Sequence, residues 1–455
     1  MRPGLALLMA LGVVRLATAT AAAAESEPVA AQRPAAAQLI KALTSDPELY
    51  PRLAYLCDTF GPRLSGSPNL ERAIDWVLDQ MRRDGLQTAH GEPVLVPRWV
   101  RGSESAALLG PREQPLTILG LGGSVATPPE GITADAVVVK SFAELDEKPE
   151  RAKGKIVVFA PPFVSYDETG AYRLFGAVRA AAHGAVAVLT RSITPYSLST
   201  PHTGVTLYKL RDGTKAVRQI PHAALSPEDA ERLRRLQERG EPLRIRLRMS
   251  ALTLPPVPSR NVVAELVGSE HPEEVVAFGG HIDSWDVGQG AHDDGGNCIA
   301  AWHALRAMQR LGLRPRRTVR LVLWTNEENG SEGAKAYAKA HAADRHVLGI
   351  EADSGIFRPT GWAFSGPAAV LSTVHDIAPL LAPLGATRID TPGGGADLRP
   401  LHEQGVPVMG LSVAGERYFW FHHSAADTVD KVDAGDLGQV AAAMAVMAYS
   451  AAQLL

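Results

Sequence analysis

The second half of the chain alternates between short apolar runs and longer stretches in which apolar residues recur at helical spacing. The expected strands are 274–278, 318–324, 347–352, 362–364 and 406–411, and the expected helices are 297–311, 331–341, 368–384 and 435–454. Such alternation is typical of a sheet whose parallel strands are joined by helical crossovers. The sequence therefore predicts an α/β fold with a mostly parallel or mixed sheet sandwiched by helices.

Residues 110–250 show a different pattern, with short runs rich in β-branched residues. The expected strands are 136–139, 155–159, 185–189 and 243–249, and the expected helices are 173–183 and 226–238. We interpret 110–250 as a β-rich module inserted into a main domain that is formed by 39–109 and 251–455. The proline-rich segment 255–258 is expected to mark the return to that main domain.

The N-terminus has the features of a cleaved secretory signal. Arg2 precedes an apolar run at 5–14, and small residues follow up to Ala24. We expect a signal peptide at 1–24, export to the periplasm or the extracellular space, and a mobile leader at 25–38 that is rich in Ala, Pro and Glu. An uncleaved anchor is the alternative, but the apolar run falls short of the roughly 20 residues that span a bilayer. No other segment is expected to be long and apolar enough to span a membrane, so we expect no stable membrane span.

Charge and cysteine content narrow the class of protein. The formal net charge of -3 gives no reason to expect a nucleic acid partner. Cys57 and Cys298 are the only cysteines, so a disulfide framework is excluded. A single bridge between them is possible after export, but we expect two buried thiols.

Three side chains that can bind metal follow three of the expected strands. His281 comes after the run 274–278, Glu328 after 318–324, and Asp353 after 347–352. Open α/β sheets bind ligands outside the carboxyl ends of their strands. These three side chains are therefore predicted to lie together at one edge of the sheet.

Two further candidates come from turns. Asp293 and Asp294 are adjacent and flanked by glycines, and two carboxylates in a tight turn repel each other unless a cation neutralises them. Capping of the next helix by Asp294 or Asn297 is a structural alternative that is compatible with a metal role for Asp293. With His423, the candidates comprise two imidazoles and three carboxylates. This set suits two zinc ions that share Asp293, although Co2+ or Mn2+ could also bind.

Two more carboxylates are assigned supporting chemistry. Glu327 precedes Glu328, and one of the two can bind metal while the other moves protons, although the sequence alone does not decide which. We assign Glu327 as the general base. Asp283 lies two residues after His281 and is expected to accept a hydrogen bond from the imidazole nitrogen that faces away from the metal.

Some assignments have competitors within the same motif. Glu351 competes with Asp353, and His422 competes with His423. Asp427 is expected to stiffen the loop that carries His423. The glycine pair before His281 is interpreted as a sharp turn after the strand.

The motifs GGHIDSWD, GAHDDGG, TNEENG, EADSG and FHHSAADT, in this order, resemble those of the M28 family of zinc peptidases with two metal ions. The resemblance implies that His281 and Asp353 bind one zinc, that Glu328 and His423 bind the other, and that Asp293 bridges them. It also implies the base role of Glu327 and the supporting role of Asp283. The inserted module is then similar to a protease-associated domain.

Members of this family are secreted, often homodimeric, and cleave short peptides with free ends. The resemblance therefore implies a homodimeric exopeptidase whose substrate is a dipeptide or short peptide. Three alternatives remain: an aminopeptidase that acts on longer peptides, a glutaminyl cyclase with one zinc, and a binding module without metal.

Overall fold

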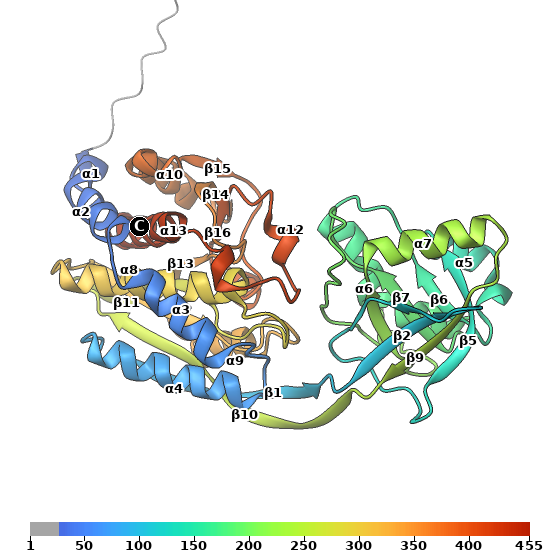
Figure 1. The fold of residues 1–455 in the computed structure, drawn as a ribbon. Helices are drawn as coiled ribbons and strands as arrows, with labels where there is room; N and C mark the ends of the chain where they lie inside the picture. The colour runs from blue at the N-terminus through green and yellow to red at the C-terminus, as the bar shows by residue number, and fades with distance from the viewer. Residues whose placement is uncertain (1–26) are drawn as a thin grey trace, which may run out of the picture.

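The structure, a computed structural model, describes residues 27–455. The predicted signal peptide at 1–24 lies outside the described residues. The described chain folds into two units that are each built on an eight-stranded sheet and are joined by a long two-stranded ribbon (Figure 1).

The larger unit contains a mixed sheet with the strand order β1-β10-β12-β11-β13-β16-β14-β15. These strands are β1 (His90–Val100), β10 (Leu252–Leu266), β11 (His271–His281), β12 (Arg317–Trp324), β13 (Arg345–Glu351), β14 (Pro359–Ser365), β15 (Arg388–Asp390) and β16 (Val408–Val413). The central strands β12, β11, β13 and β16 are parallel. Strand β10 pairs antiparallel with β12, and β1 pairs antiparallel with β10 at the edge of the sheet. The predicted α/β class with a mixed sheet is confirmed, and the parallel part forms its centre.

Helices cover both faces of this sheet. One face packs against α2 (Arg33–Thr44), α3 (Leu49–Phe60), α4 (Pro68–Arg83), α8 (Gly296–Arg310) and α13 (Ala434–Leu454), and the other against α9 (Glu332–Ala340) and α11 (Arg399–Glu403). The helix α10 (Ala368–Ile377) packs on α13. Both faces are covered because successive side chains of a strand point to opposite faces and both sets are apolar. In β12, Leu321 and Leu323 pack in the core under α8 and α13, while Val322 and Trp324 pack in the core under α9 and α11.

The smaller unit begins earlier than predicted. Its sheet has the order β3-β2-β9-β5-β6-β7-β8-β4. The strands are β2 (Glu104–Leu109), β3 (Gln114–Leu116), β4 (Ile118–Gly120), β5 (Ile132–Val139), β6 (Ile156–Phe159), β7 (Ala187–Arg191), β8 (His222–Leu225) and β9 (Arg244–Met249). The boundary at 110 is therefore wrong by several residues, because β2 pairs with β9.

Helices also pack on both faces of the smaller sheet. They are α5 (Phe142–Glu147), α6 (Tyr166–Ala182) and α7 (Pro227–Glu238). The first two share one core with the sheet, and α7 shares the other. This unit is therefore a mixed α/β structure rather than one dominated by strands.

The proline-rich segment 255–258 lies inside β10 and is not a boundary between units. There β10 pairs only with β1, for example Pro258 with Leu95, and its pairing with β12 begins at Val262. Proline is tolerated in a strand that has one free edge, because the missing N–H breaks no ladder. The prolines therefore hide β10 in the sequence, and neither β10 nor its partner β1 was among the expected strands.

The expected mobile leader is wrong for residues 27–38. The helix α1 (Glu27–Ala30) precedes α2, which begins at Arg33 with a proline in its first turn. Val29 and Ala36 are buried in the core of the larger unit. An alanine-rich segment favours helix once an apolar surface is there to receive it, and this segment packs against α13.

Helix α13 is long and apolar enough to cross a membrane by length and composition. The expectation that no segment beyond the N-terminus has this property is therefore wrong. Most of the helix is buried inside the protein, where it packs against α2, α8 and the sheet. Burial on nearly all sides explains its apolar composition.

Both cysteines are buried free thiols, as expected. Cys57 lies in α3, where burial raises its pKa to about 12. Cys298 lies in α8, and its thiol donates to the carbonyl of His281 over 3.0 Å.

Candidate active site

The two glycines before His281 lie within strand β11 and do not form a turn. A Cβ at Gly279 would lie 1.7 Å from the carbonyl oxygen of Val322, and a Cβ at Gly280 would lie 2.1 Å from a carboxylate oxygen of Asp294. The turn interpretation is therefore wrong. Glycine is required because neighbouring backbone and a buried carboxylate approach the strand too closely for any side chain.

His281, Asp293 and Asp353 converge at the carboxyl ends of the central strands. Nε2 of His281 lies 3.2 Å from Oδ1 of Asp293 and 3.5 Å from Oδ1 of Asp353. His281 ends β11, and Asp353 follows the adjacent parallel strand β13. The three side chains form one group whose donor atoms all lie within 4.8 Å of one another.

The other oxygen of Asp293 faces a second group of donors. Oδ2 lies 3.3 Å from Nε2 of His423, and that nitrogen lies 3.1 Å from Oε2 of Glu328. Asp293 therefore presents one oxygen to His281 and the other to His423. All five predicted ligands meet at one place, with Asp293 between His281 and His423.

The donor atoms of this centre fit divalent ions. Nε2 of His281 and Oδ2 of Asp293 are buried but have no hydrogen-bond partner with normal geometry among the described residues. Buried polar atoms are rarely left unpaired. Imidazole nitrogens and carboxylate oxygens are suitable ligands for zinc, so each half of the centre could hold one ion.

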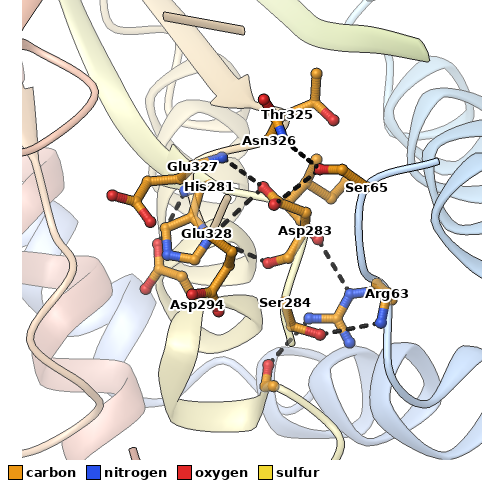
Figure 2. Close-up of polar contacts among 12 residues, drawn as sticks. Arg63, Ser65, His281, Asp283, Ser284, Asp294, Thr325, Asn326, Glu327 and Glu328 are labelled. Atoms are coloured by element: carbon orange, nitrogen blue, oxygen red, sulfur yellow. Dashed lines mark hydrogen bonds and ion pairs between the residues drawn. The ribbon is translucent and has the colours of Figure 1, made fainter. Parts of the chain in front are cut away.

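Asp283 supports the site differently from the prediction. Nδ1 of His281 lies 3.0 Å from the main-chain carbonyl of Asp283 and 3.7 Å from its carboxylate. The carboxylate instead accepts hydrogen bonds from the hydroxyl of Ser65 and the amide of Glu327, both over 3.1 Å (Figure 2). The backbone carbonyl thus fixes the ring of His281, while the Asp283 side chain positions Glu327.

Arg63, which was not among the predicted site residues, organises the loop after His281. Its fully buried guanidinium donates to the carbonyls of Ile282, Gln289 and Gly290 over 3.1, 2.6 and 3.0 Å. The amide of Arg63 also donates to the hydroxyl of Ser284 (Figure 2). Arg63 lies more than 200 residues away in the chain, so no local spacing reveals this role.

The turn that carries Asp293 and Asp294 is held in place by hydrogen bonds of Asp294 and of Asp427. Asp294 accepts from the amide of His281 over 3.0 Å and from the Asn297 side chain over 2.6 Å. The capping alternative is wrong, because no side chain caps α8. The carboxylate of Asp427 accepts from the amides of His292 and Asp293 over 2.8 and 3.1 Å. Asp427 therefore connects its own loop to the turn that carries Asp293 and Asp294.

His422 and Glu351, the alternatives to His423 and Asp353 as ligands, have different surroundings. His422 stacks on His423, and its Nε2 lies 3.6 Å from Oδ2 of Asp293, so it remains close to the centre. His423 is favoured because it also reaches Glu328. One oxygen of Glu351 accepts from the amides of Asp397 and Leu398, which turns that carboxylate toward another loop.

Glu327 faces a cleft between the two units. This cleft has a volume of about 640 Å³, and its lining includes Glu327, Glu328, Asp293 and His423 from the larger unit and Tyr166 from the smaller one. Burial and the carboxylates of the site raise the pKa of Glu327 to about 8, against the opposing effect of His281. A carboxyl group with a pKa near neutrality can accept and return a proton during a reaction.

Metal binding is expected to release protons. Burial opposes a charge on His281, but its contacts with Asp293 and Asp353 raise its pKa well above the usual value. Burial and Asp293 likewise raise the pKa of Glu328. Groups with raised pKa values hold protons near neutral pH, and a metal must displace them. The metal affinity should therefore fall as the pH falls, about tenfold per pH unit for each proton displaced.

Titration calorimetry of metal-stripped protein in buffers of different ionisation enthalpy measures the number of protons released. We expect at least one proton per protein at pH 7. A binding enthalpy that does not depend on the buffer would contradict the protonated state of these ligands.

Comparison with known proteins gives four similarities. Residues 261–448 match the family model of Peptidase family M28. The chain is 48% identical over 382 residues to carboxypeptidase Q of Mus musculus, which covers 84% of this chain and 80% of that protein. The crystal structure of a Peptidase M28 precursor from Shewanella amazonensis superposes with a TM-score of 0.88 at 33% identity, covering 93% of this chain and 97% of that one. A zinc aminopeptidase from Bacillus subtilis shares the fold, with a TM-score of 0.65 at 19% identity over 88% of this chain and 93% of that one.

Proposed function

Because the chain belongs to peptidase family M28 and is a metallopeptidase, we propose that it is an exported exopeptidase that uses two zinc ions to hydrolyse dipeptides or short peptides with free termini. Asp293 carries this proposal, because its two oxygens face two separate sets of donors. A single ion would leave one of these two sets of donors without a metal.

Each residue of the centre has a proposed role. His281 and Asp353 would hold one ion, Glu328 and His423 the other, and Asp293 would bind both. When bound, the ions would polarise the scissile carbonyl and lower the pKa of the attacking water. Glu327 takes the proton from that water and delivers it to the amine that leaves. Asp283 holds the Glu327 amide, and therefore the base, beside the cleft.

The proposal extends to the rest of the chain. We take residues 1–24 as the export signal because of their apolar run and small-residue end. The smaller unit is proposed to be a protease-associated-like domain. The homodimer is proposed from the family resemblance alone.

The test combines a metal count with a substrate screen. Purified protein, loaded with zinc and freed of excess metal, should retain two zinc ions per chain by elemental analysis. It should hydrolyse unblocked dipeptides faster than N-acetylated dipeptides and faster than hexapeptides. Rapid trimming of hexapeptides from the amino end would instead indicate an aminopeptidase, and one zinc with cyclisation of an N-terminal Gln peptide would indicate a cyclase. Protein that binds no zinc and cleaves nothing would contradict the proposal.

A further inference from the structure

The charged side chains that line the cleft divide into two groups. The carboxylates are Asp293, Glu327, Glu328 and Asp353, which are the predicted ligands and the predicted base. Every other Asp, Glu, Lys or Arg of the lining is an arginine: Arg173, Arg211 and Arg399. Two divalent cations would balance the charge of these four carboxylates, and the arginines would then leave the cleft surface positive. Such a surface favours an anionic group on the substrate.

Arg173 stands out among these arginines. It lies on α6 of the smaller unit and is only 7% exposed, whereas Arg211 and Arg399 are exposed. Within residues 27–455 its polar partners are uncharged: the Tyr166 hydroxyl at 2.8 Å, and the Thr203 carbonyl and a His423 ring nitrogen at 3.3 Å each. Its buried Nε has no partner. A buried guanidinium without a carboxylate partner is costly, so its position calls for an anion.

Arg63 provides an internal comparison. It is also a buried arginine whose partners are uncharged, but all three of its guanidinium nitrogens donate to main-chain carbonyls. Its charge is therefore used to hold the loop after His281. Arg173 keeps a free donor and lines the cleft, so the two buried arginines have different functions.

The position of Arg173 relates it to the cleaved bond. Nε2 of His423 faces Asp293 and Glu328, and Nδ1 on the other side of the same ring faces Arg173. One residue of extended chain spans about 3.3–3.6 Å. A carboxylate one residue beyond the scissile bond can therefore reach Arg173 while the scissile carbonyl lies at the metal centre.

We propose that Arg173 binds the free C-terminal carboxylate of the substrate. The inserted unit then takes part in substrate recognition, and cleavage is restricted to substrates that end one residue after the scissile bond. Tyr166 accepts a hydrogen bond from Arg173, and its own hydroxyl hydrogen is free to donate to the same carboxylate. The inference rests on the proposed function and specifies how that site reads its substrate.

The test compares a dipeptide with the same dipeptide carrying a C-terminal amide. The native enzyme should prefer the free acid by about 10²-fold in kcat/KM, since a buried cation distinguishes a carboxylate from a neutral amide. Arg173→Met should lower kcat/KM for the acid by about 10²-fold and change the value for the amide by less than about threefold. Arg173→Lys, which keeps the charge, should retain part of the preference. Arg179→Met is the matched control: this arginine lies on the same helix but outside the cleft lining, where it pairs with Asp146, and its variant should keep the preference.

Zinc content is measured for every variant. If Arg173→Met loses zinc and both substrates lose rate equally, Arg173 only supports His423 and the inference is overturned. It is also overturned if the native enzyme cleaves acid and amide equally, although the proposed function then stands. If neither compound is cleaved, the proposed function fails and the inference fails with it.

Discussion

Replacing Glu327 with Gln is expected to lower kcat about 10³-fold, equivalent to about 4 kcal/mol of transition-state stabilisation. Gln has nearly the same shape as Glu but cannot accept the proton of the attacking water. The Glu327 amide, which donates to Asp283, is unaffected by the change. Zinc content and the free energy of unfolding should therefore stay close to native values. Steady-state kinetics on a dipeptide together with elemental analysis measure both quantities.

Glu332→Gln is the matched control for this variant. The same substitution is made five residues away, at the start of α9. There the carboxylate of Glu332 is exposed and pairs with Lys335. The control should keep full activity. Full activity in Glu327→Gln as well would show that another group serves as the base, and loss of zinc would show that Glu327 is a ligand.

The centre of the fold could be predicted from the sequence because its signals are local. The runs that became β11, β12 and β13 are mostly apolar, as expected for parallel strands that are buried on both faces. The edge of the larger sheet that is formed by β1 and β10 could not be predicted in this way. Strand β10 contains three prolines, and its pairing with β1 depends on a partner more than 150 residues away. The leader was misjudged because its composition suits disorder, yet α13 offers it an apolar surface.

The site shows the same division between local and distant information. His281, Glu328 and Asp353 could be brought together because parallel strands place their carboxyl ends at one edge. Arg63 and Arg173 could not be found, because each reaches the site from a segment with no spacing relation to the ligands. The hydrogen bond assigned to the Asp283 carboxylate was also wrong, because the choice between carbonyl and carboxylate depends on local backbone geometry.

Replacing Asp293 with Ala is expected to have the largest effect of any single change in the site. Asp293 presents one oxygen to His281 and the other to His423. Its loss therefore removes a ligand from both halves and leaves the remaining carboxylates less well neutralised. We expect zinc retention to fall from two ions to fewer than one per chain and kcat/KM to fall at least about 10⁴-fold. Equilibrium dialysis against a zinc buffer measures the first quantity, and dipeptide hydrolysis measures the second.

Asp353→Ala separates the bridging role from an ordinary ligand role. Asp353 contacts only the His281 half of the centre, so this variant should lose one zinc ion and keep the other. Its side chain is partly exposed, and truncation should leave the fold intact. The expected order is two ions in the native protein, one in Asp353→Ala and fewer than one in Asp293→Ala. If Asp293→Ala and Asp353→Ala each lost a single ion, Asp293 would belong to one half only, and the assignment of a shared carboxylate would be wrong.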